Sequence, residues 1–107
     1  MANFDDRERA FETKFAHDEE MKFRIIARRN RLLGEWAARQ MGLSDVETES
    51  YAKDVVRSDF EEAGDEDVVR KLLGDLTSAD VEIDDAAVRA ALAEKTIEAR
   101  RQLLEGI

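Results

Sequence analysis

The chain has 107 residues, of which 43% are hydrophobic and 40% charged, and its 26 acidic and 17 basic residues give a net charge of −9 at pH 7. This length suits one domain with a single modest core, and the absence of cysteine excludes disulfides and thiolate metal sites. The chain has neither the N-terminal apolar run of a secretory signal nor the roughly 18 apolar residues of a membrane span. We therefore expect a cytoplasmic protein that does not insert into the membrane.

The charge is unevenly distributed along the chain. Residues 21–42 hold six basic residues and one acidic residue, whereas residues 1–20, 43–76 and 77–107 are each net acidic. A net negative field repels phosphates, so we expect no nucleic-acid binding. The simplest interpretation is that the basic segment packs among acidic neighbours of the same molecule.

Residues 4–42 contain no proline and no glycine before Gly34, and they predict one long helix. A helix of about 38 residues would be about 57 Å long, which exceeds the width of a domain of this size. We therefore expect its first turns to project from the core or to be mobile. At about 100° per residue the apolar side chains form one stripe: Phe4, Phe11, Phe15, Met21, Ile25, Ile26, Leu32, Leu33 and Trp36.

This stripe is interrupted between Phe15 and Met21, where Asp18 and Lys22 occupy positions that should be apolar. Burying one phenylalanine contributes about 1.5–3 kcal/mol, whereas ordering one residue of backbone costs about 1–2 kcal/mol. Three phenylalanines alone therefore cannot hold this segment in place, and we expect another protein to supply its docking surface. The alternative is that the phenylalanines fold back on their own bundle. We divide the chain into a partner-binding segment, residues 1–19, and a bundle domain, residues 20–107.

Three shorter helices are predicted after Gly42, which is placed to end the first helix. Ser44 and Glu47 have the spacing of a capping box, a third helix follows Asp65, and Asp84 is a good N-cap for a fourth after a loop at residues 77–82. Four amphipathic helices with short connections indicate an all-α four-helix bundle. The predicted apolar faces are Tyr51, Ala52, Val55, Val56, Phe60 and Ala63; Val68, Val69, Leu72, Leu73 and Leu76; and Val88, Ala91, Leu92, Ala99 and Leu103.

The sequence offers little for catalysis. His17 is the lone histidine, and no serine has the context of a nucleophile with its base. The acidic run at residues 61–67 lacks the pattern of a calcium loop, so we expect neither catalytic residues nor a metal site. His17, beside Asp18 and Glu19, is either an exposed polar residue, which we favour, or a proton sensor.

A second interpretation concerns the basic face of the first helix. Arg24, Arg28, Arg31 and Arg39 share one side of it. There they would pair with acidic residues of the bundle, or bind phosphate, RNA or an acidic protein surface. The alternative function is thus a small helical regulatory module that binds adenine nucleotide weakly through Arg24, Arg28 and Arg31. Apart from this nucleotide we expect no cofactor.

Three long strings carry a resemblance to a known family: F-D-D-R-E-R-A-F-E-T-K-F-A-H-D-E-E-M at residues 4–21, A-R-R-N-R-L-L-G-E-W-A at 27–37 and D-F-E-E-A-G-D-E-D-V at 59–68. They resemble the zeta subunit of alphaproteobacterial F-type ATP synthases. The resemblance implies a four-helix inhibitor, not an enzyme. Its N-terminal segment would enter the interface between alpha and beta subunits of the ATPase head and block ATP hydrolysis, acting as a ratchet on the rotor.

Carried onto this chain, the resemblance makes residues 1–19 the inhibitory segment. It implies the alpha, beta and gamma subunits as partners, and a cytoplasmic location peripheral to the inner membrane. We expect a monomer when the protein is free. The implied apolar anchors are Phe4, Phe11 and Phe15, and the implied charged contacts are Asp5, Arg7, Glu8, Glu12 and Lys14.

Overall fold

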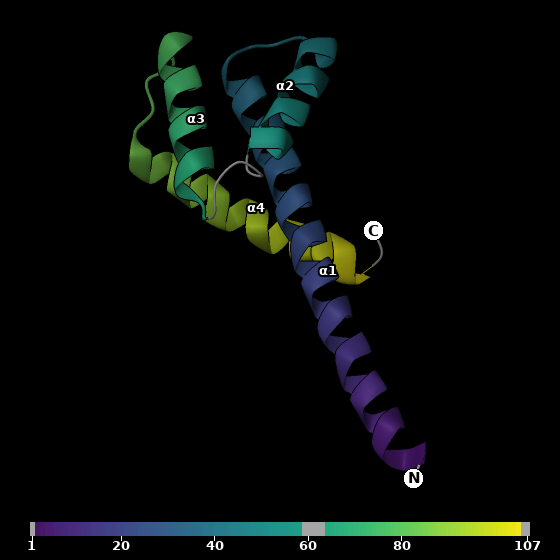
Figure 1. Cartoon of the computed structure of the whole chain (residues 1–107). Coiled ribbons are helices and arrows are strands. Elements are labelled where there is room, and N and C mark those ends of the chain that lie inside the picture. Colours follow the sequence, from purple (N-terminus) through teal and green to yellow (C-terminus); the bar gives the residue numbers. More distant parts are fainter. Residues whose placement is uncertain (1, 59–63, 106–107) are drawn as a thin grey trace.

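The computed structural model describes residues 2–58 and 64–105, with side chains from Asp18 onward. Within these ranges the chain forms four helices and no strand: α1 (Ala2–Gln40), α2 (Asp45–Ser58), α3 (Glu66–Ser78) and α4 (Asp85–Glu105) (Figure 1). This arrangement confirms the predicted all-α four-helix fold with a long N-terminal helix. Phe60 and Ala63, which we expected on the face of the second helix, lie outside the described residues.

The N-terminal half of α1 extends well away from the other helices (Figure 1). The molecule measures 66 × 26 × 21 Å along its principal axes because this helix is so much longer than the bundle is wide. The predicted projection is therefore confirmed. In the bundle, α2 runs back along the C-terminal half of α1, and α4 crosses α1 near the point where the projecting part begins (Figure 1).

The turn between α1 and α2 has the backbone and side-chain bonds that its sequence predicts. Gly42 adopts a left-handed φ of 73°, and the N–H groups of Gly42 and Leu43 donate to the carbonyls of Arg39 and Ala38, which is a Schellman motif. The next residues form the capping box, since Glu47 N–H donates to Ser44 Oγ at 3.2 Å and Ser44 N–H donates to Glu47 Oε1 at 3.0 Å.

The end of α3 differs from the prediction. The helix continues to Ser78, two residues into the expected loop, and ends because Asp80 takes a left-handed φ of 61°. The N–H groups of Asp80 and Val81 then donate to the carbonyls of Thr77 and Leu76. An aspartate thus fills the place that glycine usually fills in this motif. The start of α4 agrees with the prediction, since Asp84 Oδ1 accepts the N–H of Ala87 at 2.9 Å.

The core lies where all four helices meet. Trp36, Tyr51, Leu73, Ile83 and Leu92 are partly buried and pack against it, so Trp36 is a core residue, as the apolar stripe predicts. At Gly34 the helices α1 and α2 approach so closely that an added Cβ would lie 2.8 Å from the Cα of Ala52. The fully buried apolar residues with the largest side chains are Leu33, Val55, Val68, Leu72, Leu76 and Val88.

Candidate functional site

The projecting part of α1, residues 2–20, is called the arm below. Its backbone is helical, so Phe4, Phe11 and Phe15 lie within about 40° of one another around the helix axis. The side chains of the residues expected to contact a partner lie outside the described part of the structure: Phe4, Asp5, Arg7, Glu8, Phe11, Glu12, Lys14 and Phe15, together with His17.

The arm is continuous with a part of α1 that is firmly held in the bundle. Arg29 and Asn30 are buried there, with 5% and 1% of their surfaces exposed. Arg29 Nη1 lies 2.9 Å from Asp65 Oδ1, and Arg29 Nε donates to Asn30 Oδ1 at 3.0 Å. This anchor was not predicted, because the arginines of α1 were interpreted as one basic segment. The signal was present, since Arg29 and Asn30 lie three to four residues before Leu33 on its helix face.

The three arginines expected to bind nucleotide do lie together. Arg24, Arg28 and Arg31 line an open groove of about 410 Å³ between α1, α2 and α4, whose apolar wall is Ala27, Val56 and Leu103. Arg39, which we placed on the same side of the helix, does not line this groove, and its Nη2 lies 3.8 Å from Glu35 Oε2.

Internal contacts occupy most of the basic groups in this groove. Arg24 pairs with Glu20 at 2.7 Å within α1. Arg31 pairs with Glu49 of α2 at 2.7 Å, and hydrogen bonding to Arg31 holds the pKa of Glu49 below its ordinary value. Arg28 donates to Gln102 of α4 at 3.3 Å. The expectation that α1 pairs with acidic residues of the bundle is therefore confirmed for Arg31, whereas Arg24 finds its partner in its own helix.

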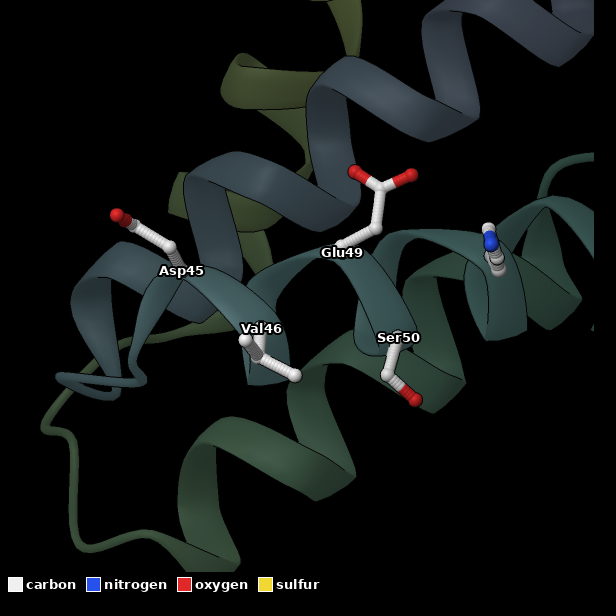
Figure 2. Close-up of a pocket in the computed structure, with 5 residues that line it drawn as sticks. Asp45, Val46, Glu49 and Ser50 are labelled. Atoms are coloured by element: carbon white, nitrogen blue, oxygen red, sulfur yellow. The ribbon is translucent and has the colours of Figure 1, made fainter.

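A second hollow, of about 480 Å³, lies on the outer surface of α2 (Figure 2). Asp45, Val46, Glu49 and Ser50 line it together with Lys53. The side chain of Val46 projects from the outer side of α2, and 80% of its surface is exposed. The hollow is an open surface, and its lining residues include no histidine or cysteine.

A long helical arm on a small bundle, with shallow surface grooves, is typical of a protein that acts through contact with another protein. The family described as ATPase inhibitor subunit zeta matches residues 1–102. The chain belongs to this family, as the resemblance of its three strings indicates. The family is one of regulatory subunits, and it supports association with ATP synthase and a role as an ATPase inhibitor.

The fold is also similar to a known structure. A protein whose structure was determined by NMR in solution has 45% identical residues and a TM-score of 0.72, over 81% of this chain and 99% of that one. None of the curated proteins matches this sequence. Among the described residues, no helix has the length and apolar character needed to cross a membrane.

Proposed function

We propose that this protein inhibits ATP hydrolysis by the F-type ATP synthase by inserting its arm into the catalytic interface between alpha and beta subunits, where it also blocks rotation of gamma. The single observation that supports this mechanism most is the projection of α1 beyond the bundle (Figure 1). A preformed helix with three phenylalanines on one face suits docking into an apolar groove. The protein would then reside in the cytoplasm, peripheral to the inner membrane.

Inhibition of this kind works by occupancy. The catalytic interface must close during turnover, and a helix bound in the open cleft raises the barrier to closure by its own binding free energy. About 1.4 kcal/mol of that free energy slows hydrolysis tenfold. Phe4, Phe11 and Phe15 supply the apolar anchors, since buried aromatic residues dominate many interfaces. Asp5, Arg7, Glu8, Glu12 and Lys14 set the register of the arm in the groove.

The two parts of the chain have different tasks in this proposal. Residues 1–19 carry the inhibitory contacts, and residues 20–107 form the domain that presents them. The ion pair of Arg29 with Asp65 and the close packing at Gly34 fix the base of the arm against the bundle. A firmly held base supports inhibition because less conformational entropy remains to be lost on binding.

Deletion of residues 1–19 tests the mechanism. We expect the remaining chain to keep the amide chemical shifts of its bundle and to lose inhibition in an ATP hydrolysis assay on the cognate enzyme. A finer pair of variants compares Phe11→Ala in the arm with Phe23→Ala, which removes a 60% exposed phenylalanine of the same helix outside the arm. Phe11→Ala should weaken inhibition and Phe23→Ala should not. Undiminished inhibition by the deletion variant would refute the wedge.

The groove of Arg24, Arg28 and Arg31 supports a second candidate function, binding of adenine nucleotide. The favourable observation is that three guanidinium groups line one groove and that Arg28 has an amide and no carboxylate as its described partner. Two of the three arginines must give up or share ion pairs to bind phosphate, so we expect weak binding. Titration of ATP against amide shifts tests it, with Arg28→Gln expected to remove the response. No shifts at millimolar ATP would exclude the site.

A further inference from the structure

α4 carries apolar side chains on two opposite faces. Val88, Ala91 and Ala99 are buried against the bundle. On the other side a second row is exposed to solvent along the whole helix, and we call this row the outer stripe. Its members are Ala86, Ala90, Ala93, Ile97 and Leu104.

The outer stripe has the spacing of a helix-docking surface. Its members follow one another at intervals of four, three, four and seven residues, which is the repeat of a helix–helix seam. Ile97 and Leu104 are 69% and 64% exposed, and they are among the large apolar residues that the bundle leaves uncovered. The three alanines between them and the start of α4 let another helix approach closely.

The charges beside the stripe indicate the chemistry of what covers it. Arg100 and Arg101 flank its C-terminal half on either side, within about 60° of the stripe around the helix axis. Neither of them forms an ion pair with any residue in the described ranges, whereas Arg89 is paired with both Glu66 and Asp85. An acidic helix with large apolar side chains would match both the alanines of the stripe and these two arginines.

The arm of this same protein has that chemistry. Residues 1–20 hold seven acidic and three basic residues, and Phe4, Phe11 and Phe15 follow one another at intervals of seven and four. Large rings opposite alanines give the alternation of large and small side chains that closely packed helices require. The acidic residues of the arm complement Arg100 and Arg101, although the whole chain is acidic.

The arm cannot reach the outer stripe of its own molecule. It continues the axis of α1 away from the bundle (Figure 1), and folding it back would require a break in a helix that has no proline or glycine before Gly34. We infer that the arm docks on the outer stripe of a second copy, and that the second copy returns the contact, which closes a two-fold dimer. The free protein then stores its arm in a dimer, contrary to our expectation of a monomer.

The regulatory consequence rests on the proposed function. If the arm is the inhibitory segment, a dimer with both arms covered does not inhibit, and the active species is the monomer. Inhibition then rises less than proportionally with total protein concentration. Variants of the outer stripe inhibit at lower total concentration than the natural sequence does.

Sedimentation of the full chain at rising concentration tests the dimer. We expect the mass to approach twice the 12.2 kDa of one chain at millimolar concentration. The variant Ile97→Glu with Leu104→Glu should stay at the mass of one chain, because both residues are exposed and the new charges repel the acidic arm. Val46→Glu is the matched control, since it alters an exposed apolar residue outside the stripe and should leave the dimer intact. Amide spectra confirm that each variant is folded.

A paramagnetic label identifies what occupies the stripe. Because the chain has no cysteine, Ala10→Cys accepts one spin label, and labelled chain is mixed with nitrogen-15 chain that carries none. Broadening of the amides of Ala90 and Ala93 supports the docked arm. A monomer at all concentrations, broadening confined to other helices, or a dimer that survives deletion of residues 1–19 overturns it. The last outcome indicates pairing of two α4 helices instead.

No ATPase is present in these measurements, so their outcome does not depend on the proposed function. If deletion of residues 1–19 leaves inhibition intact, the proposed function fails whatever the sedimentation shows. If the deletion abolishes inhibition and the full chain is a monomer, only the stored dimer fails.

Discussion

Arg29 Nη1 lies 2.9 Å from Asp65 Oδ1, and this ion pair joins the middle of α1 to the residue before α3. Only 6% of the Arg29 side chain is exposed, whereas 52% of the Asp65 side chain is. The ion pair therefore joins a buried cation of α1 to a half-exposed carboxylate at the edge of the bundle. Arg29 Nε also donates to its neighbour Asn30 within α1, and the ion pair with Asp65 is a polar contact that ties this part of α1 to the rest of the bundle.

Replacing Asp65 with alanine should destabilise the protein measurably. A buried guanidinium loses a carboxylate partner, and we expect a loss of about 1–3 kcal/mol in the free energy of unfolding. Urea unfolding followed by circular dichroism measures it. Asp67→Ala is the control, because it removes a carboxylate two residues away, in the first turn of α3, whose partner Arg70 is exposed and 3.5 Å away. Equal losses in the two variants would contradict a special role for Arg29.

Gly34→Ala should separate α1 from α2. The new Cβ would lie 2.8 Å from Ala52 Cα and 3.2 Å from Val55 Cγ2, and neither the backbone atom nor a buried valine can yield easily. Overpacking of this kind costs about 1–3 kcal/mol, which exceeds the gain in helix propensity of about 1 kcal/mol. Gly74→Ala is the matched control because its Cβ meets open space. It should raise the unfolding midpoint in urea while Gly34→Ala lowers it.

Local signals in the sequence predicted most of the fold. The capping box of Ser44 and Glu47, the stop at Gly42 and the cap at Asp84 each depend on residues within a few positions of one another, so a single sequence contains all the information they need. The end of α3 was misplaced because Asp80 takes the left-handed conformation, which aspartate adopts much less often than glycine does.

The candidate site was less predictable where it depends on distant residues. The helix face of Leu33 indicates that Arg29 points inward, but the sequence does not show that its partner is Asp65, which is 36 residues away. The outer stripe of α4 was not predicted either, because only the face that contains Val88, Ala91 and Ala99 was assigned from the sequence. The sequence and the helical backbone of α1 place the phenylalanines of the arm on a common helix face. The contacts that these phenylalanines make with a partner stay a prediction.

Acid should weaken the bundle through its surface ion pairs. Hydrogen bonding to Arg89 lowers the pKa of Glu66, and hydrogen bonding to Arg31 lowers that of Glu49, each from an ordinary value of 4.5. Between 4.5 and the lowered folded values the unfolded chain binds more protons than the folded chain. The contribution of these two ion pairs to the free energy of unfolding is therefore fully present above pH 4.5, and it decreases as the pH falls through that window.

The pH dependence of the urea midpoint measures this effect. The double variant Glu49→Gln with Glu66→Gln should show a shallower fall between neutral and acidic pH than the natural chain. Glu82→Gln removes one exposed carboxylate from the loop before α4 and should follow the natural chain. A double variant with an unchanged profile would mean that these two pairs do not contribute to acid sensitivity.

Asp80→Gly should stabilise the protein, although most substitutions do the reverse. Asp80 holds a φ of 61°, a conformation that costs an ordinary residue about 1–2 kcal/mol and glycine almost nothing. Glycine loses more entropy on folding, so the net gain should be a fraction of this cost, about 0.5 kcal/mol. Ala79→Gly is the control, since Ala79 has an ordinary φ of −91°. Glycine there relieves no strain and only adds to the entropy lost on folding. A higher thermal midpoint for Asp80→Gly and a lower one for Ala79→Gly are expected. If both fall, the φ of Asp80 costs the folded protein less than the entropy that glycine loses on folding.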